Sequence, residues 1–322
     1  MTTRASHPAP SHTHAWGYGL ATLTMDGRVL DTWFPSPALG SPPEGREPWL
    51  VPSELEKLAR PDERRRVRRE PVAVGIELAA APADVPDAYL RLHLLSHLLV
   101  APNTINLDGI FGLLPSVVST NAGPMDPADF AELRPALQQA GIQASGLDKF
   151  PRLLDYVVPE RVRIADAARV RLGAHLAPGT TVMHEGFVNF NAGTLGASMV
   201  EGRISQGVVV DDGADIGGGA SIMGTLSGGG NVRVEIGPRA LLGANAGVGI
   251  SLGADSVVEA GLYVTAGTKV LWHEPGRAPR TIKAAELSGT PQLLFRRNSV
   301  SGAVEAHPRS GYGVTLNSAL HG

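Results

Sequence analysis

An aliphatic residue returns at every sixth position between Ile164 and Val270, and this repeat restricts the fold more than any other feature of the chain. A small residue usually stands four places later, as Ala168, Ala174 and Ala192 do. A period of six matches neither the 3.6-residue period of an α-helix nor the alternation of a single strand. It is typical of a parallel β-helix, in which each hexad forms one short strand and its turn. Three hexads then make one triangular coil, and the aliphatic residues fill the interior.

The repeat comes in four runs that are out of phase with one another. The first run skips one hexad at Thr194, and the main interruption is the glycine-rich insert at residues 227–231. Inserts in such repeats map to loops on one side of the prism and often carry function. We therefore predict a mainly β chain with a left-handed parallel β-helix over residues 159–271.

The flanking segments follow different patterns. Residues 1–14 are predicted to be a mobile tail, residues 15–158 an N-terminal α/β domain, and residues 272–322 a C-terminal cap and tail that covers the open end of the prism. Within the N-terminal domain, the pattern predicts a hairpin turning at Asp26-Gly27, a strand and three helices. The strand is expected at residues 71–79, and the helices at residues 54–69, 87–100 and 126–140.

Two polar features of these helices have alternative interpretations. Five arginines between positions 64 and 69 form either a solvated helical face or a docking site for an anionic partner. His93 and His97 are four residues apart and could bind a metal. No glutamate accompanies them in the His-Glu-x-x-His arrangement, so interior packing or a hydrogen bond is favoured.

Composition excludes several classes of function. A net charge of −3 gives no basic footprint for nucleic acid. The absence of cysteine excludes disulfides, thiolate metal sites and a cysteinyl acyl-enzyme. No apolar run reaches the length of a membrane span, and no signal peptide is recognisable at the start. We expect a cytoplasmic protein without membrane or nucleic-acid partners.

Three features of the repeat region indicate where chemistry occurs. Polar side chains crowd into residues 184–207, glycine-rich turns at 217–219 and 228–230 allow a ligand to approach the backbone, and Lys283, Arg296 and Arg297 could neutralise phosphates. Together they favour a long polyanionic ligand lying along the prism.

Four segments carry a more specific signal than the hexad itself. They are residues 183–193 (MHEGFVNFNAG), 198–205 (SMVEGRIS), 243–247 (GANAG) and 294–299 (LFRRNS). Over residues 150–305 the chain resembles the tetrahydrodipicolinate N-succinyltransferases, hexapeptide-repeat acyltransferases of lysine and diaminopimelate biosynthesis. The resemblance implies a homotrimer with active sites between subunits and a small amino-dicarboxylate substrate. Succinyl-CoA would be the acyl donor, and the products would be N-succinyl-2-amino-6-oxopimelate and CoA.

The resemblance also assigns residues. Glu201 matches the proposed catalytic carboxylate of the family. The positions that match contacts to succinyl-CoA are Arg203, Gly218, Ser221, Ala244, Glu259, Ala260, Gly267, Lys283, Arg296, Arg297, Asn298 and Ser299. A carboxylate can serve as the general base for an attacking amine or as a nucleophile that forms a mixed anhydride, and both mechanisms stay open. Glu201 could also form only a hydrogen bond at a subunit interface.

One departure concerns a metal. Similar chains hold a divalent cation such as Mg²⁺ near the trimer axis with two carboxylates, of which Glu185 matches one. Ala168 stands at the position of the other, and Asp166 lies two residues earlier. Three Glu185 side chains could still share a hard cation with waters.

Other functions remain as alternatives. The same fold could use acetyl-CoA on the same or a related amine, or could be a catalytically silent trimeric scaffold. A carbonic anhydrase of this fold needs closely spaced histidines in the coils, whereas His175 and His184 are nine residues apart. A nucleotidyltransferase needs a phosphate-binding loop near the N-terminus, and Gly17-Tyr18-Gly19 is too short a match.

Overall fold

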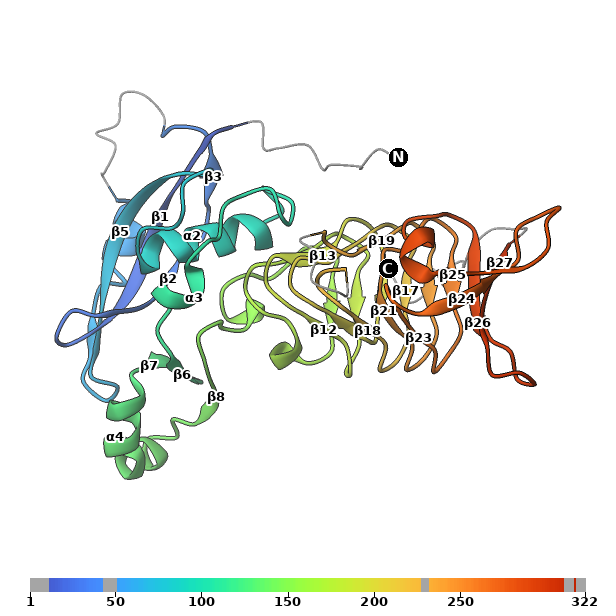
Figure 1. The fold of residues 1–322 in the computed structure, drawn as a ribbon. Helices are drawn as coiled ribbons and strands as arrows, with labels where there is room; N and C mark the ends of the chain where they lie inside the picture. The colour runs from blue at the N-terminus through green and yellow to red at the C-terminus, as the bar shows by residue number, and fades with distance from the viewer. Residues whose placement is uncertain (1–11, 43–50, 227–231, 310–315, 317–322) are drawn as a thin grey trace. The chain divides into compact units, whose positions relative to one another are not determined.

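The computed structural model describes residues 12–42, 51–226, 232–309 and 316, and the chain divides into two compact units at Val157/Val158. The tail predicted over residues 1–14 therefore lies largely outside the described residues, and His14 already begins the first strand. The second unit is almost entirely β-structure, and its coils stack along one axis (Figure 1). The structure thus shows a mainly β chain.

The first unit is built on an antiparallel sheet in the order β2-β1-β5-β4, with β3 paired to β1. The predicted hairpin is present, because β1 and β2 pair on either side of the Asp26-Gly27 turn. The strands are β1 (His14–Thr24), β2 (Val29–Trp33), β3 (Ala38–Leu39), β4 (Pro61–Asp62) and β5 (Val67–Glu77). A second sheet has the order β7-β6-β8, with β6 (Val117–Thr120), β7 (Gly123–Met125) and β8 (Ala144–Asp148).

Two of the predicted helices are confirmed. They are α2 (Val85–Ser96) and α4 (Pro127–Gln139), and the Asp126 side chain caps α4 by accepting from the backbone N–H groups of Ala128 and Asp129. Two single-turn helices, α1 (Ser53–Glu56) and α3 (Ile110–Leu113), and the 3-10 turn η1 (Leu153–Asp155) complete this unit.

The helix predicted over residues 54–69 is wrong beyond its first turn. Pro61 begins β4 and Val67 begins β5, so residues 63–66 form the turn of a β-hairpin, and Arg68 and Arg69 lie in its second strand. Arg65 is buried and donates to Asp62 at 2.9 Å, while Arg66 pairs with Glu132 of α4. These arginines hold the unit together, which differs from the solvated helical face that the pattern favoured.

His93 of α2 belongs to the core. Its Nε2 accepts from the backbone N–H of Phe34 at 3.2 Å, and its Nδ1 lies 2.8 Å from the carbonyl oxygen of Tyr89. Burial lowers its pKa to about 3, so the ring is neutral at physiological pH. Packing and hydrogen bonding account for this histidine, as the sequence favoured.

The second unit is a three-sided parallel β-helix, and each side is a parallel sheet. The first face has β9 (Arg163–Ile164), β11 (Thr181–Val182), β14 (Met199–Val200), β17 (Asp215–Ile216), β20 (Leu241–Leu242) and β22 (Val257–Val258). The second face has β12 (Phe187–Val188), β15 (Arg203–Ile204), β18 (Ser221–Ile222), β21 (Gly247–Gly249) and β23 (Tyr263–Thr265). The third face has β10 (Ala174–Leu176), β13 (Ala192–Thr194), β16 (Val209–Val210) and β19 (Glu235–Ile236).

The hexad aliphatics fill the interior, as predicted. Val182, Val200, Ile216 and Leu242 are completely buried, and they stack above one another along the first face. Burying such a side chain contributes about 1.5–3 kcal/mol relative to leaving it exposed.

Thr194 fills the skipped hexad and is also fully buried. Its hydroxyl lies 2.6 Å from that of Thr180 and accepts from the N–H of Ala177 at 3.2 Å. The polar exception in the interior is therefore satisfied by hydrogen bonds.

The out-of-phase runs correspond to coils of different length. The coil that joins Thr181 to its strand partner Met199 spans three full hexads, whereas the next coil, from Met199 to Asp215, is shorter. On the third face the coil from Val209 to Glu235 is longer than either, and Thr225 and Arg233 form an antiparallel bridge within it. The predicted insert at 227–231 itself lies outside the described residues.

The C-terminal segment adds one more rung to the prism. Its elements are β24 (Lys269–Trp272), β25 (Arg280–Lys283), η3 (Ala284–Leu287), β26 (Leu293–Arg297) and β27 (Val304–Pro308), whereas the 3-10 turn η2 (Ala167–Arg169) lies in the first coil, between β9 and β10. β26 pairs in parallel with β22, and β27 pairs with both β24 and β26. The edge of β22 is thereby covered instead of presenting unpaired backbone groups.

Candidate active site

Most of the candidate residues stack along one corner of the prism, between the first and second faces. Because Val200, Ile216, Leu242 and Val258 pair in successive rungs, the residues that follow them also lie above one another. We call this line the corner ridge, and it consists of Glu201-Gly202, Gly217-Gly218, Gly243-Ala244, Glu259-Ala260 and Arg296-Arg297.

Backbone hydrogen bonds tie the corner ridge together. The N–H of Gly219 donates to the carbonyl oxygen of Glu201 at 3.2 Å, and that of Gly261 donates to Ala244 at 2.8 Å. The side chain of Glu201 lies beside the glycine turn, since a Cβ added to Gly218 would be 3.7 Å from its Oε2. A carboxylate thus borders a stretch of backbone that a ligand can approach closely.

The second face adjoins the corner ridge and carries a row of outward-facing residues in register. Arg203 pairs with Ser221, Ser221 with Gly247, and Gly247 with Tyr263. The guanidinium of Arg203 donates to the hydroxyl of Ser221 at 2.5 Å, and the hydroxyl of Tyr263 reaches the same oxygen at 3.5 Å. These groups place hydrogen-bond donors next to the ridge.

Gly247 and Tyr263 of this row were not predicted. A Cβ on Gly247 would lie 2.0 Å from the Tyr263 ring, so only glycine lets the ring lie flat across this strand. Nothing in the sequence indicates this contact, because the two residues meet only through the strand register.

Gly267 and Lys283 lie at the opposite edge of the second face. Gly267 is in the turn that leaves β23, and β25 returns antiparallel so that Lys283 pairs with Lys269. The N–H of Ala284 donates to Thr268 at 2.9 Å, which fixes this return. The candidates therefore frame the second face on both sides.

The basic run Arg296 to Ser299 forms the end of β26 and the tip of the β26–β27 hairpin. Glu259 accepts from the backbone N–H of Arg297 at 2.6 Å, which joins the hairpin to the corner ridge. The carbonyl oxygen of the Asn298 side chain accepts from the N–H groups of Val300 and Ser301, so Asn298 shapes the tip. Ser299 is exposed there.

Glu305 of β27 holds this hairpin together through hydrogen bonds to its side chain. Its side chain is only 5% exposed, and it accepts hydrogen bonds from His307 at 2.9 Å, Asn298 at 2.9 Å and Arg296 at 3.1 Å. These contacts lower the pKa of Glu305 to about 2. A buried carboxylate thus fixes two of the residues predicted to contact the donor.

His273, Glu305 and His307 also form the one group of three metal-ligating side chains found among the described residues, with ligand atoms within 4.8 Å of one another. The two rings are stacked, with centroids 4.0 Å apart and planes inclined by 16°. Lone pairs of parallel rings do not converge on one point, and Arg296 already supplies the positive charge next to Glu305. The cluster is better suited to holding the hairpin than to holding a metal.

Glu185 lies apart from the corner ridge and is 70% exposed. Arg169 donates to its carboxylate at 3.3 Å. Asp166 accepts from the N–H of Ala168 and caps η2, so it stays at its own turn. At the predicted cation site, a single chain therefore supplies the carboxylate of Glu185, which is already paired with the guanidinium of Arg169.

All of the candidate residues are exposed or half-buried in the single chain. An open surface exposes a reacting thioester to water, so the second face and its corner ridge need a covering element to become an enclosed site.

Family models and curated relatives match this chain. Residues 233–266 match the family model described as the hexapeptide repeat of succinyl-transferase, and residues 114–152 match the one described as tetrahydrodipicolinate N-succinyltransferase middle. The chain is 58% identical over 253 residues to the 2,3,4,5-tetrahydropyridine-2,6-dicarboxylate N-succinyltransferase of Pseudomonas paraeruginosa, covering 78% of this chain and 73% of the relative. The enzyme of the same name from Pseudomonas aeruginosa is 57% identical over the same length and coverage.

A solved structure shows the same fold. It is a Campylobacter jejuni protein described as a 2,3,4,5-tetrahydropyridine-2-carboxylate N-succinyltransferase, with a TM-score of 0.79 and 30% identity. The alignment covers 91% of this chain and 92% of that one, so both units take part in the likeness.

Proposed function

Because the chain belongs to the tetrahydrodipicolinate N-succinyltransferase family, we propose how its corner ridge and second face carry out succinyl transfer. The chain is an N-succinyltransferase, and its acyl donor is succinyl-CoA. The acceptor is tetrahydrodipicolinate, and the products are N-succinyl-2-amino-6-oxopimelate and CoA. The reaction serves lysine and diaminopimelate biosynthesis.

Glu201 is the general base in this proposal. The amine nitrogen of the acceptor attacks the thioester carbonyl carbon, a C–N bond forms, and the C–S bond breaks. One water first adds across the C=N bond of the acceptor ring and gives the ring nitrogen its proton. Glu201 takes this proton during the attack and passes it to the departing thiolate, and the ring C–N bond then breaks to leave the 6-oxo group. The observation that carries this assignment is the position of the Glu201 carboxylate beside the Gly218 turn, where a backbone N–H group can stabilise the developing oxyanion. Direct transfer also avoids an anhydride that water would hydrolyse.

Donor binding extends along the corner ridge and across the second face. Arg203 and Ser221 offer a guanidinium and a hydroxyl beside Glu201, and Arg296, Arg297 and Lys283 offer positive charge toward the phosphates. The other ridge and hairpin positions bring backbone to the ligand. These are Gly218, Ala244, Glu259, Ala260, Gly267, Asn298 and Ser299.

A homotrimer would complete the site, since the candidate residues of one chain lie on an open surface. Side-by-side packing of prisms places the second face of one subunit against a neighbour and encloses the reacting groups.

We also propose that the coils wind left-handedly, that the domain limits are those given by the sequence, and that residues 272–322 serve as cap and tail. Since a polyanionic thioester does not cross a membrane unaided, enzyme and donor share a compartment, for which we propose the cytoplasm. No helix in the described ranges is both long and apolar enough to span a bilayer.

The predicted divalent cation finds a poor ligand set in this chain. Glu185 is paired with Arg169, and Ala168 offers no ligand. Mg²⁺ prefers several oxygen ligands and cannot replace them with a guanidinium. No step of the reaction is assigned to a metal.

Release of CoA thiol tests this function. Succinyl-CoA and acetyl-CoA are each supplied with tetrahydrodipicolinate or 2-aminopimelate, and acceptor-dependent release with succinyl-CoA strongly preferred is expected. A preference for acetyl-CoA would indicate the acetyltransferase alternative, and no release with either donor would contradict the proposal.

The role of Glu201 is tested with Glu201→Gln, which should lower kcat by about 10²–10⁴-fold and leave the oligomer intact by light scattering. Glu235→Gln on the third face is the matched control and should retain activity. Loss of the oligomer in Glu201→Gln would instead support a structural role at a subunit interface. Trapping of a succinylated Glu201 by rapid quenching would favour the anhydride mechanism.

A further inference from the structure

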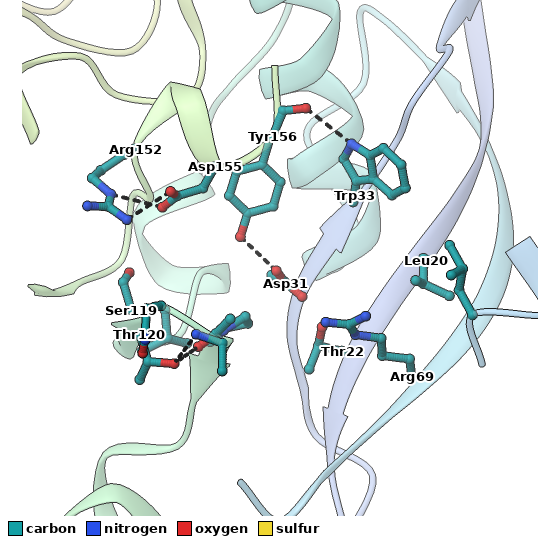
Figure 2. A pocket seen from close by; sticks show the side chains of 16 residues that line it. Leu20, Thr22, Asp31, Trp33, Arg69, Ser119, Thr120, Arg152, Asp155 and Tyr156 are labelled. Carbon is teal, nitrogen blue, oxygen red and sulfur yellow. Dashed lines mark hydrogen bonds and ion pairs between the residues drawn. The ribbon is translucent and has the colours of Figure 1, made fainter. Parts of the chain in front are cut away.

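A cavity lies within the first unit. It has a volume of about 380 Å³ and is bordered by β1, β2, β5, the β6–β7 hairpin and η1 (Figure 2). Pockets of roughly 300–1,000 Å³ hold small organic ligands. The residues proposed above for succinyl transfer all belong to the other unit, and none of them lines this cavity.

Strand register places three polar residues in one row on the cavity floor. Thr22 of β1 pairs with Asp31 of β2 on one side and with Arg69 of β5 on the other. Directly paired residues of antiparallel strands project to the same face of the sheet. Asp31 and Arg69 therefore lie on opposite sides of Thr22, and all three line the cavity (Figure 2).

Asp31 is a buried carboxyl with one unused oxygen. The residue is 5% exposed, and its Oδ2 accepts from the hydroxyl of Tyr156 at 2.7 Å. Its Oδ1 is buried and has no hydrogen-bond partner among the described residues. Burial raises the pKa of this carboxyl, although Thr22, Tyr156 and Arg69 act in the opposite direction. An unsatisfied buried acceptor costs about 1–3 kcal/mol, so a donor supplied by a ligand would be favourable.

Arg69 is the matching unused donor. Within the described ranges its side chain takes part in no hydrogen bond and no ion pair, whereas its backbone N–H donates to the carbonyl oxygen of Arg60. The other cation in the cavity, Arg152, is engaged by Asp155 through two hydrogen bonds of 2.8 and 2.9 Å. The cavity thus presents one free acceptor and one free guanidinium on either side of a threonine.

We propose that this cavity binds a small α-amino acid in its zwitterionic form. The ammonium group donates to Oδ1 of Asp31, and the carboxylate accepts from the guanidinium of Arg69. The two charged groups of an α-amino acid are attached to one carbon, which suits two partners separated by a single strand. The amino-acid side chain extends over the apolar part of the lining, formed by Leu20, Trp33 and Val117.

The charges exclude simpler ligands. A dicarboxylate would bring a second negative charge against Asp31, and a plain amine would leave Arg69 without a partner. A zwitterion satisfies both groups and adds no net charge to the cavity.

Isothermal titration calorimetry on the full-length protein tests this site. The probes are L-lysine, L-leucine and L-glutamate, each beside its analogues lacking the α-amino group or the α-carboxylate. At least one amino acid should bind saturably with one site per chain, and both of its analogues should bind at least about 10-fold more weakly, as expected for one lost charged hydrogen bond. No saturable binding of the three amino acids at 10 mM (roughly the limit of useful affinity) would overturn the proposal.

Variants locate the contacts. Asp31→Asn preserves the shape of the side chain and should weaken binding about 10-fold or more, as should Arg69→Gln. Arg64→Gln is the matched control, because Arg64 lies in the turn that precedes β5 and does not line this cavity. Equal affinity in Asp31→Asn, Arg69→Gln and the control would refute the assignment.

Hydrogen exchange on the unmodified protein gives a second test that does not depend on the variants folding. Bound amino acid should slow exchange in peptides covering residues 29–33 and 67–77. Protection found only in peptides of the corner ridge would mean that the amino acid occupies the acylation site, and the proposed cavity would be wrong. This test is independent of turnover, so it separates the cavity from the transferase function.

Discussion

Replacing Glu305 with glutamine should loosen the hairpin that carries Arg296 and Asn298. In the structure the Glu305 carboxylate accepts hydrogen bonds from both of these side chains and from His307. Glutamine keeps the size of the side chain but loses its charge. Its amide nitrogen is itself a donor, so it cannot accept a hydrogen bond from the groups that donate to the carboxylate. We expect the hairpin to open more often and Arg296 to lose its fixed position.

The size of the effect follows from the contacts. Each hydrogen bond to a charged group contributes about 1.5–3 kcal/mol, but such contributions are not additive. The Arg296 side chain is 47% exposed and regains water when its partner is neutralised, which reduces the loss. We therefore expect local opening to become easier by about 1–3 kcal/mol, which corresponds to about 5- to 150-fold faster exchange of the hairpin amides.

Native-state hydrogen exchange of residues 293–309 measures this change directly. Kinetics with succinyl-CoA provide the functional measurement. The variant should show a higher KM for succinyl-CoA and a smaller change in kcat, because Glu305 acts by positioning Arg296. Glu160→Gln is the control, since Glu160 is exposed and forms no ion pair with any other residue that the structure describes.

The pH dependence has a defined sign. The pKa of Glu305 is about 2 in the folded protein, below its ordinary value of 4.5. Its stabilising contribution is therefore fully present above pH 4.5 and is lost as the pH falls toward 2. Protection of the hairpin, corrected for intrinsic exchange, should decline across this range in the wild type more than in Glu305→Gln. If the wild type and the variant decline in parallel, the carboxylate does not stabilise the hairpin and the reasoning fails.

Three further changes test other parts of the structure. Removal of divalent ions with EDTA should leave the oligomer and the rate of thiol release unchanged, because Arg169 pairs with Glu185; a loss restored by Mg²⁺ would show that a cation is required. Gly247→Ala should push the Tyr263 ring off the second face and raise the KM for succinyl-CoA by several-fold, and wild-type kinetics would contradict this contact. Thr194→Val should change the free energy of unfolding by less than about 1 kcal/mol, whereas Thr194→Ala should lower it by more because it leaves a cavity; denaturant titration distinguishes these outcomes.

The prism was predictable because its signal is local and repeated. Each hexad places one aliphatic residue inside, so a strict period in the sequence specifies the interior without knowledge of distant contacts. Thr194 was visible as a skip, but its hydrogen bond to Thr180 depends on how neighbouring strands stack and could not be read from spacing.

The arginine-rich segment shows the opposite case. A run of charged residues after Glu54 resembles an exposed helix, yet Pro61 cannot donate to a helix and Val67 opens a long strand. The partner of Arg66 is Glu132, which lies in a different helix. Such a long-range ion pair leaves no local pattern, so the hairpin could not be predicted with the same rules.

The site falls between these cases. Its residues were assigned by resemblance, and the sequence did not indicate that Glu201, Gly218, Ala244 and Glu259 lie in line. That alignment depends on coils of unequal length, some of which are shorter and some longer than a uniform three-hexad repeat. The row of Asp31 and Arg69 is likewise a product of strand register, and neither residue alone carries a signal in the sequence.

The unequal coils have a consequence for how such a chain can change. The long coil from Val209 to Glu235 stacks on its neighbours through the same kind of strand pairs as the short coil from Met199 to Asp215, so a difference in coil length leaves the strand ladder in register. Closing a longer loop costs only about 0.6 kcal/mol for each doubling of its length. The chain can therefore gain or lose segments between strands while the spacing of the corner ridge is preserved. New specificity can be acquired there by insertion, independently of the machinery that performs the transfer.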